Sequence, residues 1–478
     1  ANAGRGQDAA EVYAAAAESA QAAEQIELRR LVADQLLRSG RVTEGVRATQ
    51  RLLEAVGITW PRTPFRALLA ILWNMLLVVF ARFRFERRGL RDSSQITPEE
   101  LSRIDVCWSV NLGLSFADPV RSIAFQKRQL VLSYRAGEPI RLARALGAEV
   151  VAWAANGIAY DERTQRVVES ARRIASRAGS THATAFVTMA SGLADYLSGR
   201  NVSARASLEE ALDLFRNRCT GVAWELASTE AFLLWTLFRL GEFRALVERS
   251  PQLVKGAEER GDLYLQCMLR MGLPNLRWLV LDRPEDAHRE ALDILGRLPG
   301  EPAPMHRYYA MIARVHACLY SGDLEEAMTL LEADWDAVEQ SMIFRIESVR
   351  HEADWLRMRV RARLAFARGD ESLLALARED AERLSRSPIP WVAGVGHLAE
   401  ASFERRRGRH DEALAHLDRA QRLFDEGTMR MFSAATRRRR GEMVGHGSGA
   451  DLVDQADAAM RAEGVVDPRR MADLLAPL

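Results

Sequence analysis

The sequence predicts an all-α protein, built as a right-handed superhelical solenoid of antiparallel helix pairs. Its 478 residues are 48% hydrophobic and 27% charged, and they contain almost no alternating stretch of the kind that forms strands. A glycine that ends one apolar helix and precedes the next recurs at Gly40, Gly199, Gly241, Gly322, Gly369 and Gly408. From Gly199 onward the numbers of successive glycines differ by 42, 81, 47 and 39. A period near 40 is typical of stacked helix pairs.

A small residue follows these turns at a constant distance. It lies five positions after the glycine at Gly45, Ala204, Ala327 and Ala413, where we expect the paired helix to approach too closely for a larger side chain. Asp282 stands 40 residues before Gly322, and Ala287 follows it by five. We therefore expect a turn at Asp282, although no glycine is present.

The turns and prolines divide the chain into five parts. Residues 1–58 are expected to form N-terminal repeats, the first cut short at Ala1, so that Ala1 is not a natural start. Residues 59–95 hold a joint and a long apolar helix, and 96–299 and 300–444 form the middle and C-terminal repeats. Repeated prolines predict joints at Trp60–Pro64, Leu298–Pro304 and Ser387–Pro390. In 445–478 we expect a flexible glycine linker and two capping helices.

The long apolar helix is the most unusual segment. Residues 67–81 read ALLAILWNMLLVVFA, and arginines follow at Arg82, Arg84, Arg87 and Arg88. Fifteen residues span about 22 Å, less than the ~30 Å hydrocarbon core, so a membrane span is disfavoured. Burial among neighbouring helices is the preferred interpretation. The alternative is docking on a membrane surface or a partner helix through Leu72, Trp73, Leu76, Val79 and the four arginines.

Charge and cysteine content exclude several function classes. There are 66 basic and 65 acidic residues, and a net charge of +1 provides no general field for nucleic acid. We interpret the arginine runs 405–407 and 437–440 as solvated, or locally balanced by acidic neighbours. The four cysteines lie 112, 48 and 51 residues apart, which suggests neither a disulfide framework nor a zinc site and fits a reducing cytoplasm.

No catalytic motif is present in the sequence. It lacks a P-loop, the kinase signatures and HExxH. The string Gly394-Val-Gly396-His-Leu-Ala399 lies inside an expected helix, so we assign these glycines to close helix packing rather than to a dinucleotide. His351, Glu352 and Asp354 are interpreted as a solvated surface. We therefore predict no catalytic, cofactor-binding or metal-binding residue in this chain, and no enzyme activity.

Particular segments nevertheless resemble a known family. They are NAGRGQDAAEVYAAAAE, LLRSGRVTEGVRATQRLLEAVGITWPRTPFRALL, SGDLEEAMTLL and MRAEGVVDPRRMADLLAPL. These resemble the C-terminal tetratricopeptide-like region of large bacterial serine/threonine protein kinases that also carry a regulatory ATPase module. The resemblance implies a sensor and scaffold arm, with kinase and nucleotide-binding modules before Ala1. The period here is nearer 40 than the standard value of about 34 residues.

The predicted function is protein interaction in cytoplasmic signalling. We expect a groove, lined by the first helix of each pair, to bind a peptide or the kinase or ATPase module of the same protein. The candidate groove contacts are Arg314, Arg350, Trp355 and Arg357, chosen as polar or aromatic residues on expected first helices. The alternatives are a ligand-sensing arm of an ATPase-type transcription regulator and a scaffold that docks on membranes through residues 67–81. An enzyme in a helical cavity would need convergent titratable groups that the sequence does not display.

Overall fold

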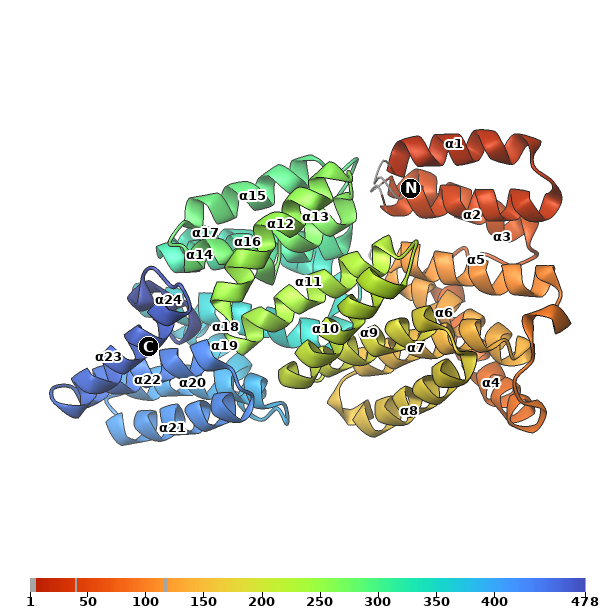
Figure 1. Cartoon of the computed structure of the whole chain (residues 1–478). Helices are drawn as coiled ribbons and strands as arrows, with labels where there is room; N and C mark the ends of the chain where they lie inside the picture. Colours follow the sequence, from red (N-terminus) through yellow and green to blue (C-terminus); the bar gives the residue numbers. More distant parts are fainter. Residues whose placement is uncertain (1–5, 39–40, 116–117, 478) are drawn as a thin grey trace.

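The computed structural model describes residues 6–38, 41–115 and 118–477, which form 24 α-helices and four short 3₁₀ helices (Figure 1). This confirms the all-α prediction. The N-terminal helices are α1 (Gly6–Ser19), α2 (Ala22–Arg38), α3 (Val42–Ala55) and α4 (Pro64–Arg88). The middle helices are α5 (Pro98–Leu114), α6 (Pro119–Ala136), α7 (Pro139–Ala155), α8 (Asp161–Ala178), α9 (Thr181–Leu197), α10 (Asn201–Arg218), α11 (Ala223–Leu240), α12 (Phe243–Glu259), α13 (Leu263–Arg270), α14 (Arg277–Val280) and α15 (Pro284–Gly296). The C-terminal helices are α16 (Pro304–Ser321), α17 (Leu324–Gln340), α18 (Glu347–Arg368), α19 (Glu371–Ser385), α20 (Pro390–Arg406), α21 (His410–Glu426), α22 (Arg430–Val444), α23 (Ser448–Ala462) and α24 (Pro468–Leu475).

The recurring turns lie where the sequence predicts them. The five predicted turn glycines Gly199, Gly241, Gly322, Gly369 and Gly408 all have a left-handed backbone, with φ between 68° and 89°. Asp282 adopts the same conformation, with φ of 57°, and its carboxylate accepts hydrogen bonds from Tyr320 and Arg470. A left-handed backbone is uncommon for residues other than glycine. At Asp282 the side chain is held by these two hydrogen bonds. Gly40 lies outside the described residues.

The small residues after the turns sit at helix crossings. Ala204, Ala287, Ala327 and Ala413 are all 0% exposed. A Cβ atom added at Gly45 would lie 2.6 Å from a side-chain carbon of Leu37. The predicted close approach of a neighbouring helix is therefore confirmed at Gly45, and the four alanines are buried.

The proline joints are also confirmed, because α4, α16 and α20 begin at or just inside them, at Pro64, Pro304 and Pro390. The connection expected over 445–449 is shorter in the structure, where only residues 445–447 lie between α22 and α23. Helix α23 begins within that stretch, and a Cβ atom at Gly441 would lie 2.5 Å from the carbonyl oxygen of Gly449. The glycines therefore allow α22 and α23 to cross closely after a tight turn. Gly396 similarly packs against α19, since its Cβ would lie 2.3 Å from the backbone nitrogen of Ser385, so the packing interpretation there is confirmed.

The C-terminal helices fold back on the middle helices. The turn after α9 contacts the start of α20, because a Cβ atom at Gly199 would lie 2.9 Å from Ile389. The rings of Phe238 on α11 and Phe432 on α22 are 6.2 Å apart. Between α23 and α24, the backbone N–H of Val466 donates to the carbonyl of Val280 at 3.0 Å. The side of the C-terminal helices that carries these contacts is consequently covered by the middle helices.

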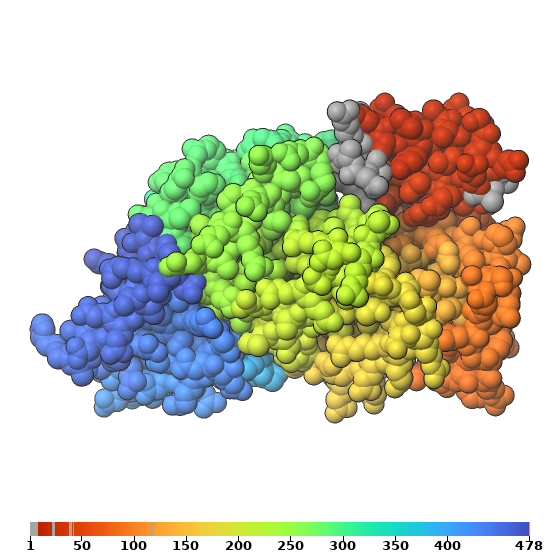
Figure 2. Space-filling model, in the orientation of Figure 1, coloured from red at the N-terminus to blue at the C-terminus, as the bar shows by residue number. Residues whose placement is uncertain are grey.

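The hydrophobic core is continuous from α5 to α24. One cluster of buried apolar side chains runs from Trp108 to Ala476, whereas α3 and the following loop share a smaller cluster with α5 and α6 around Leu52, Leu53 and Phe125. The N-terminal and C-terminal helices occupy opposite ends of an elongated molecule (Figure 2). Helices α1–α3 join the rest of the chain mainly where α2 packs on α5.

Candidate functional site

The predicted groove contacts do not form one surface. Trp355 on α18 is 4% exposed, and its ring packs at 5.6 Å against a phenylalanine of α22. Arg350 and Arg357 lie on another face of α18, where their guanidinium groups donate to Asp354 at 3.1 and 3.2 Å. Arg314 is half-buried on α16. The structure uses Trp355, Arg350 and Arg357 to pack the C-terminal helices together, and it does not bring the four residues into a shared groove.

The expected polar surface at His351 and Glu352 is wrong. Glu352 is 5% exposed and forms an ion pair with Arg239 of α11, which is 3% exposed. The hydroxyl groups of Tyr196 and Tyr308 each donate to Glu352 at 3.2 Å. Burial, reinforced by this carboxylate, raises the pKa of both tyrosines well above the usual value. The cluster joins α9, α11, α16 and α18, and its geometry is that of a structural ion pair.

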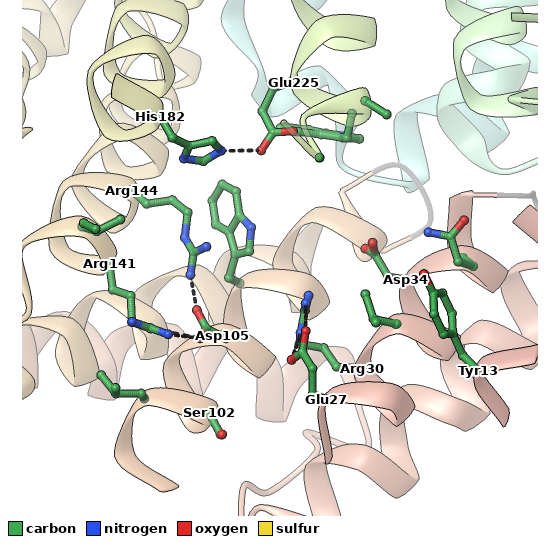
Figure 3. Close-up of a pocket in the computed structure, with 18 of the residues that line it drawn as sticks. Tyr13, Glu27, Arg30, Asp34, Ser102, Asp105, Arg141, Arg144, His182 and Glu225 are labelled. Atoms are coloured by element: carbon green, nitrogen blue, oxygen red, sulfur yellow. Dashed lines mark hydrogen bonds and ion pairs between the residues drawn. The ribbon is translucent and has the colours of Figure 1, made fainter. Parts of the chain in front are cut away.

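A polar cleft of about 800 Å³ opens instead between the N-terminal helices and the middle helices. It is lined by side chains of α1, α2, α5, α7, α9 and α11 and by residues 260–264 (Figure 3). We call this feature the α2–α11 cleft. The helices α7, α9 and α11 present their N-terminal turns to it, with Ile140, His182 and Ala223 among the lining residues.

A carboxylate bound by two arginines forms one wall of the cleft. Asp105 of α5 accepts hydrogen bonds from two arginines of α7, from Arg141 at 2.6 Å and from Arg144. Burial alone would raise the pKa of Asp105, but the charges and hydrogen bonds of Arg144 and Arg141 outweigh it and lower the pKa. The Arg144 guanidinium also lies 4.8 Å from the ring centroid of Trp108. Asp105 is therefore an ionised acceptor held in position, and not a general acid.

Two further pairs face the same space. Arg30 of α2 binds Glu27 and also donates to the hydroxyl of Ser109 at 2.6 Å, which ties α2 to α5. On the opposite wall, His182 and Glu225 approach to 3.3 Å between α9 and α11. Figure 3 shows Glu27 and Arg30 on one side of the space between the helices and His182 and Glu225 on another.

The cleft presents aromatic surface and charges of both signs. Trp108 and Trp224 make an edge-to-face contact at 6.4 Å, and Tyr13 and Tyr264 also line the space. Its charged lining side chains are Arg30, Arg141, Arg144, Arg260, Glu27, Asp34, Asp105, Glu225 and Asp262. Mixed charges beside indole rings suit a peptide that carries both polar and apolar side chains.

Sequence reasoning missed this cleft. Its lining comes from seven helices and from the turns before α11 and α13, spread over residues 13–264, and no two of these segments are related by a recurring motif. Only the position of Arg141 and Arg144 at helical spacing, i and i+3, could have suggested a shared target.

The thiol groups are not poised for nucleophilic chemistry. Burial raises the pKa of Cys107 and Cys267 to about 12 and that of Cys318 to about 11, and it also raises the pKa of Cys219. Such thiols are protonated near neutral pH. In residues 6–38, 41–115 and 118–477, no group of three or more His, Cys, Asp or Glu side chains is placed to hold a metal ion.

The arginine run 437–440 is largely engaged within the fold. Arg438 binds Asp457 at 2.8 Å, and Arg439, which is 4% exposed, donates to the carbonyl oxygen of Ala476 at 2.6 Å. Arg440 binds Asp418 at 3.2 Å. These contacts attach α22 to α21, α23 and the segment that follows α24.

The burial expected for the long apolar helix is wrong. Helix α4 covers 25 residues, and only Ala67, Asn74 and Ala81 are buried, on the side that packs against α6. Ten large apolar side chains are 37% to 68% exposed, and we call them the α4 apolar face: Phe65, Leu68, Leu69, Leu72, Trp73, Met75, Leu76, Val79, Phe80 and Phe83. Arg82, Arg84, Arg87 and Arg88 are exposed in its last two turns. Among the helices that the structure describes, α4 alone is long and apolar enough to cross a membrane by length and composition.

In comparisons with known proteins, no family model matched this chain, and no curated protein matched it.

Proposed function

We propose that this chain is a non-catalytic scaffold that binds proteins or peptides, arranged as a right-handed solenoid of tetratricopeptide-like helix pairs with a period near 40 residues. The observation that carries the proposal is the α2–α11 cleft. Its central ionic groups, Asp105 with Arg141 and Arg144, are paired with one another, which suits recognition rather than proton transfer.

The size and chemistry of the cleft favour a peptide segment. A volume of about 800 Å³ lies within the range of about 300 to 1,000 Å³ that is typical of binding sites. Indole rings contribute contact area at low entropic cost, and the paired charges orient the polar groups of a ligand. The resemblance to bacterial serine/threonine kinases makes the kinase and ATPase modules of such a protein the first partners to test.

Calorimetry of the whole chain with separately produced kinase and ATPase modules of that class tests this proposal. The informative variant is Ser102→Trp, because Ser102 lines the cleft on α5 and a tryptophan there would fill it. The matched control is Ser203→Trp, since Ser203 is exposed on α10. We expect binding by the wild type and the control, and at least tenfold weaker binding by Ser102→Trp.

Absence of binding at high micromolar concentration by either module would contradict the proposed partners. Equal affinities of Ser102→Trp and the wild type would contradict the cleft as the binding site. Circular dichroism of both tryptophan variants verifies that the helices are retained.

A further inference from the structure

We propose that α4 docks this protein on the surface of a bilayer that contains anionic phospholipids, with the helix lying in the plane of the interface. This inference is independent of the α2–α11 cleft. It comes from the shape of the exposed surface, the charges at its two ends and the attachment of the helix to α6.

The exposed surface of α4 is broad. At 3.6 residues per turn, the α4 apolar face covers an arc of about 160° directly opposite the buried line of Ala67, Asn74 and Ala81. No polar side chain of residues 65–83 falls within that arc. A partner helix in a coiled coil would need only a narrow seam of two residues in seven, so the breadth of this surface favours a lipid interface over a single helical partner.

The charges at the ends of α4 complement anionic headgroups. Residues 62–88 contain six arginines and one acid, Glu86, which leaves a net charge of +5 from six minus one. Arg62 and Arg66 precede or begin the helix, and the other four arginines are in its last two turns. All six are exposed. Long arginine side chains at both ends of an apolar helix can reach the headgroups while the helix lies at the boundary with the acyl chains.

The attachment of α4 to α6 favours an in-plane position over a span. At one end, Arg121 of α6 donates to the carbonyls of Pro61 and Arg62 at 2.8 and 3.0 Å. At the other end, the backbone N–H of Arg91 donates to the carbonyl of Gly137 at 2.9 Å. A helix that crossed the bilayer would have to break these contacts or take α6 with it, and α6 is packed on its other sides against α5 and α7.

Trp73 supports the same orientation. It lies near the middle of α4 and is 60% exposed. In a spanning helix this indole would lie near the bilayer centre, whereas tryptophan prefers the membrane–water interface. In a helix that lies in the plane of the interface, Trp73 takes that preferred position together with the rest of the face. The α4 helix is drawn at the margin of the molecule in Figure 1, away from the C-terminal helices.

Vesicle flotation of the whole chain tests the docking. The vesicles are phosphatidylcholine alone, or phosphatidylcholine with about one third phosphatidylserine. We expect flotation with the anionic vesicles and at least tenfold weaker binding to the neutral ones. The triple variant Leu72→Gln, Leu76→Gln, Val79→Gln should lose flotation. A control with three exposed apolar residues changed elsewhere, Val202→Gln, Leu292→Gln and Leu376→Gln, should keep it, as should Ser102→Trp in the cleft.

Fluorescence measures the depth of insertion. The emission of the wild type should shift to shorter wavelength on anionic vesicles, and Trp73→Phe should still float but lose that shift. Quenching by lipids brominated near the headgroup should exceed quenching by lipids brominated near the chain end. Stronger quenching from the chain end would overturn the in-plane orientation.

Three further outcomes would overturn the proposal. Equal binding to neutral and anionic vesicles would contradict a contribution of the arginines to membrane binding. The wild type could fail to float and be dimeric in sedimentation, while the triple glutamine variant is monomeric. That result would show that a second copy covers the face. No flotation by a monomeric chain would show that the face is not a membrane contact.

Discussion

Helices α4 and α18 are the two longest in the described chain, at 25 and 22 residues, and their environments are the reverse of their compositions. Apart from Asn74, residues 67–81 of α4 are all apolar, yet this segment lies mostly at the surface. Helix α18 contains nine charged residues, yet it buries Glu352, Asp354 and Arg359, which are 5%, 2% and 1% exposed. The comparison teaches that the position of a helix among its neighbours, and not its own composition, decides whether it is buried.

The difference has a physical cause in the packing of each helix. Helix α18 lies among α16, α17, α19 and α20, and its charges have partners on those elements and beyond, such as Arg239 for Glu352. A buried charge is tolerated when it is paired and hydrogen-bonded. Helix α4 packs chiefly on α6, and the described residues leave the α4 apolar face exposed.

The largest expected effect comes from removing the buried carboxylate on α18. Glu352→Ala would leave Arg239 buried without its counterion, and we expect the free energy of unfolding to fall by about 3 to 5 kcal/mol. Denaturant unfolding followed by circular dichroism measures this change. The double variant Glu352→Leu, Arg239→Met removes both charges and should recover much of the loss. An unchanged unfolding midpoint in Glu352→Ala would contradict a structural role for this pair.

A smaller effect is expected from acid, through the histidine beside α18. His316 donates from Nδ1 to the carbonyl of Ile312 at 2.7 Å, and its Nε2 accepts from Arg359 at 2.8 Å. Burial, and secondarily the charge of Arg359, holds the pKa of His316 well below its usual value. Above a pH of about 6.5, this histidine is neutral in both the folded and the unfolded chain, and its contribution to stability is complete.

As the pH falls below about 6.5, the unfolded chain binds the proton first, so stability decreases. Between pH 6.5 and pH 4.5, His316→Gln should lose less stability than the wild type, because its unfolded chain lacks this proton-binding imidazole. Unfolding curves at several pH values test this. The control is His446→Gln, in the exposed turn between α22 and α23, which should follow the wild type. Parallel curves for all three proteins would contradict the role of His316.

The smallest expected effect is on α4 itself. Changing Leu72, Leu76 and Val79 to glutamine should alter the free energy of unfolding by less than about 1 kcal/mol, because exposed substitutions are close to neutral. If α4 were a core helix, each change would cost about 2 to 5 kcal/mol. Thermal unfolding without lipid makes the measurement. A large decrease would mean that another part of the protein covers the face in solution.

Local features of the fold could be predicted well. The glycine turns, the turn at Asp282 and the proline joints depend on residues within a few positions of one another. The tight α22–α23 turn differed from the expected linker, because Gly441 and Gly449 act as a crossing point, and their contact depends on the relative placement of two helices.

The candidate sites were less predictable. The α2–α11 cleft brings Arg30, Asp105 and Glu225 to one space from three helices far apart in the sequence, and no spacing between them reports that contact. Trp355 was chosen as a groove residue, but it is buried against rings of His316 on α16 and Phe432 on α22. Residues 67–81 were recognised as a nearly continuous apolar segment, but the preferred interpretation was burial, whereas the structure exposes many of them.

The sequence by itself determined the glycine turns and proline joints between helices, because those features follow from hydrogen bonds and steric limits that act over four or five residues. Only the tertiary structure decided which helix faces are covered. Burial depends on contacts between residues that can be more than a hundred positions apart, as Arg239 and Glu352 are. The tertiary structure therefore placed charged side chains of α18 inside the protein and left the apolar side chains of α4 at its surface.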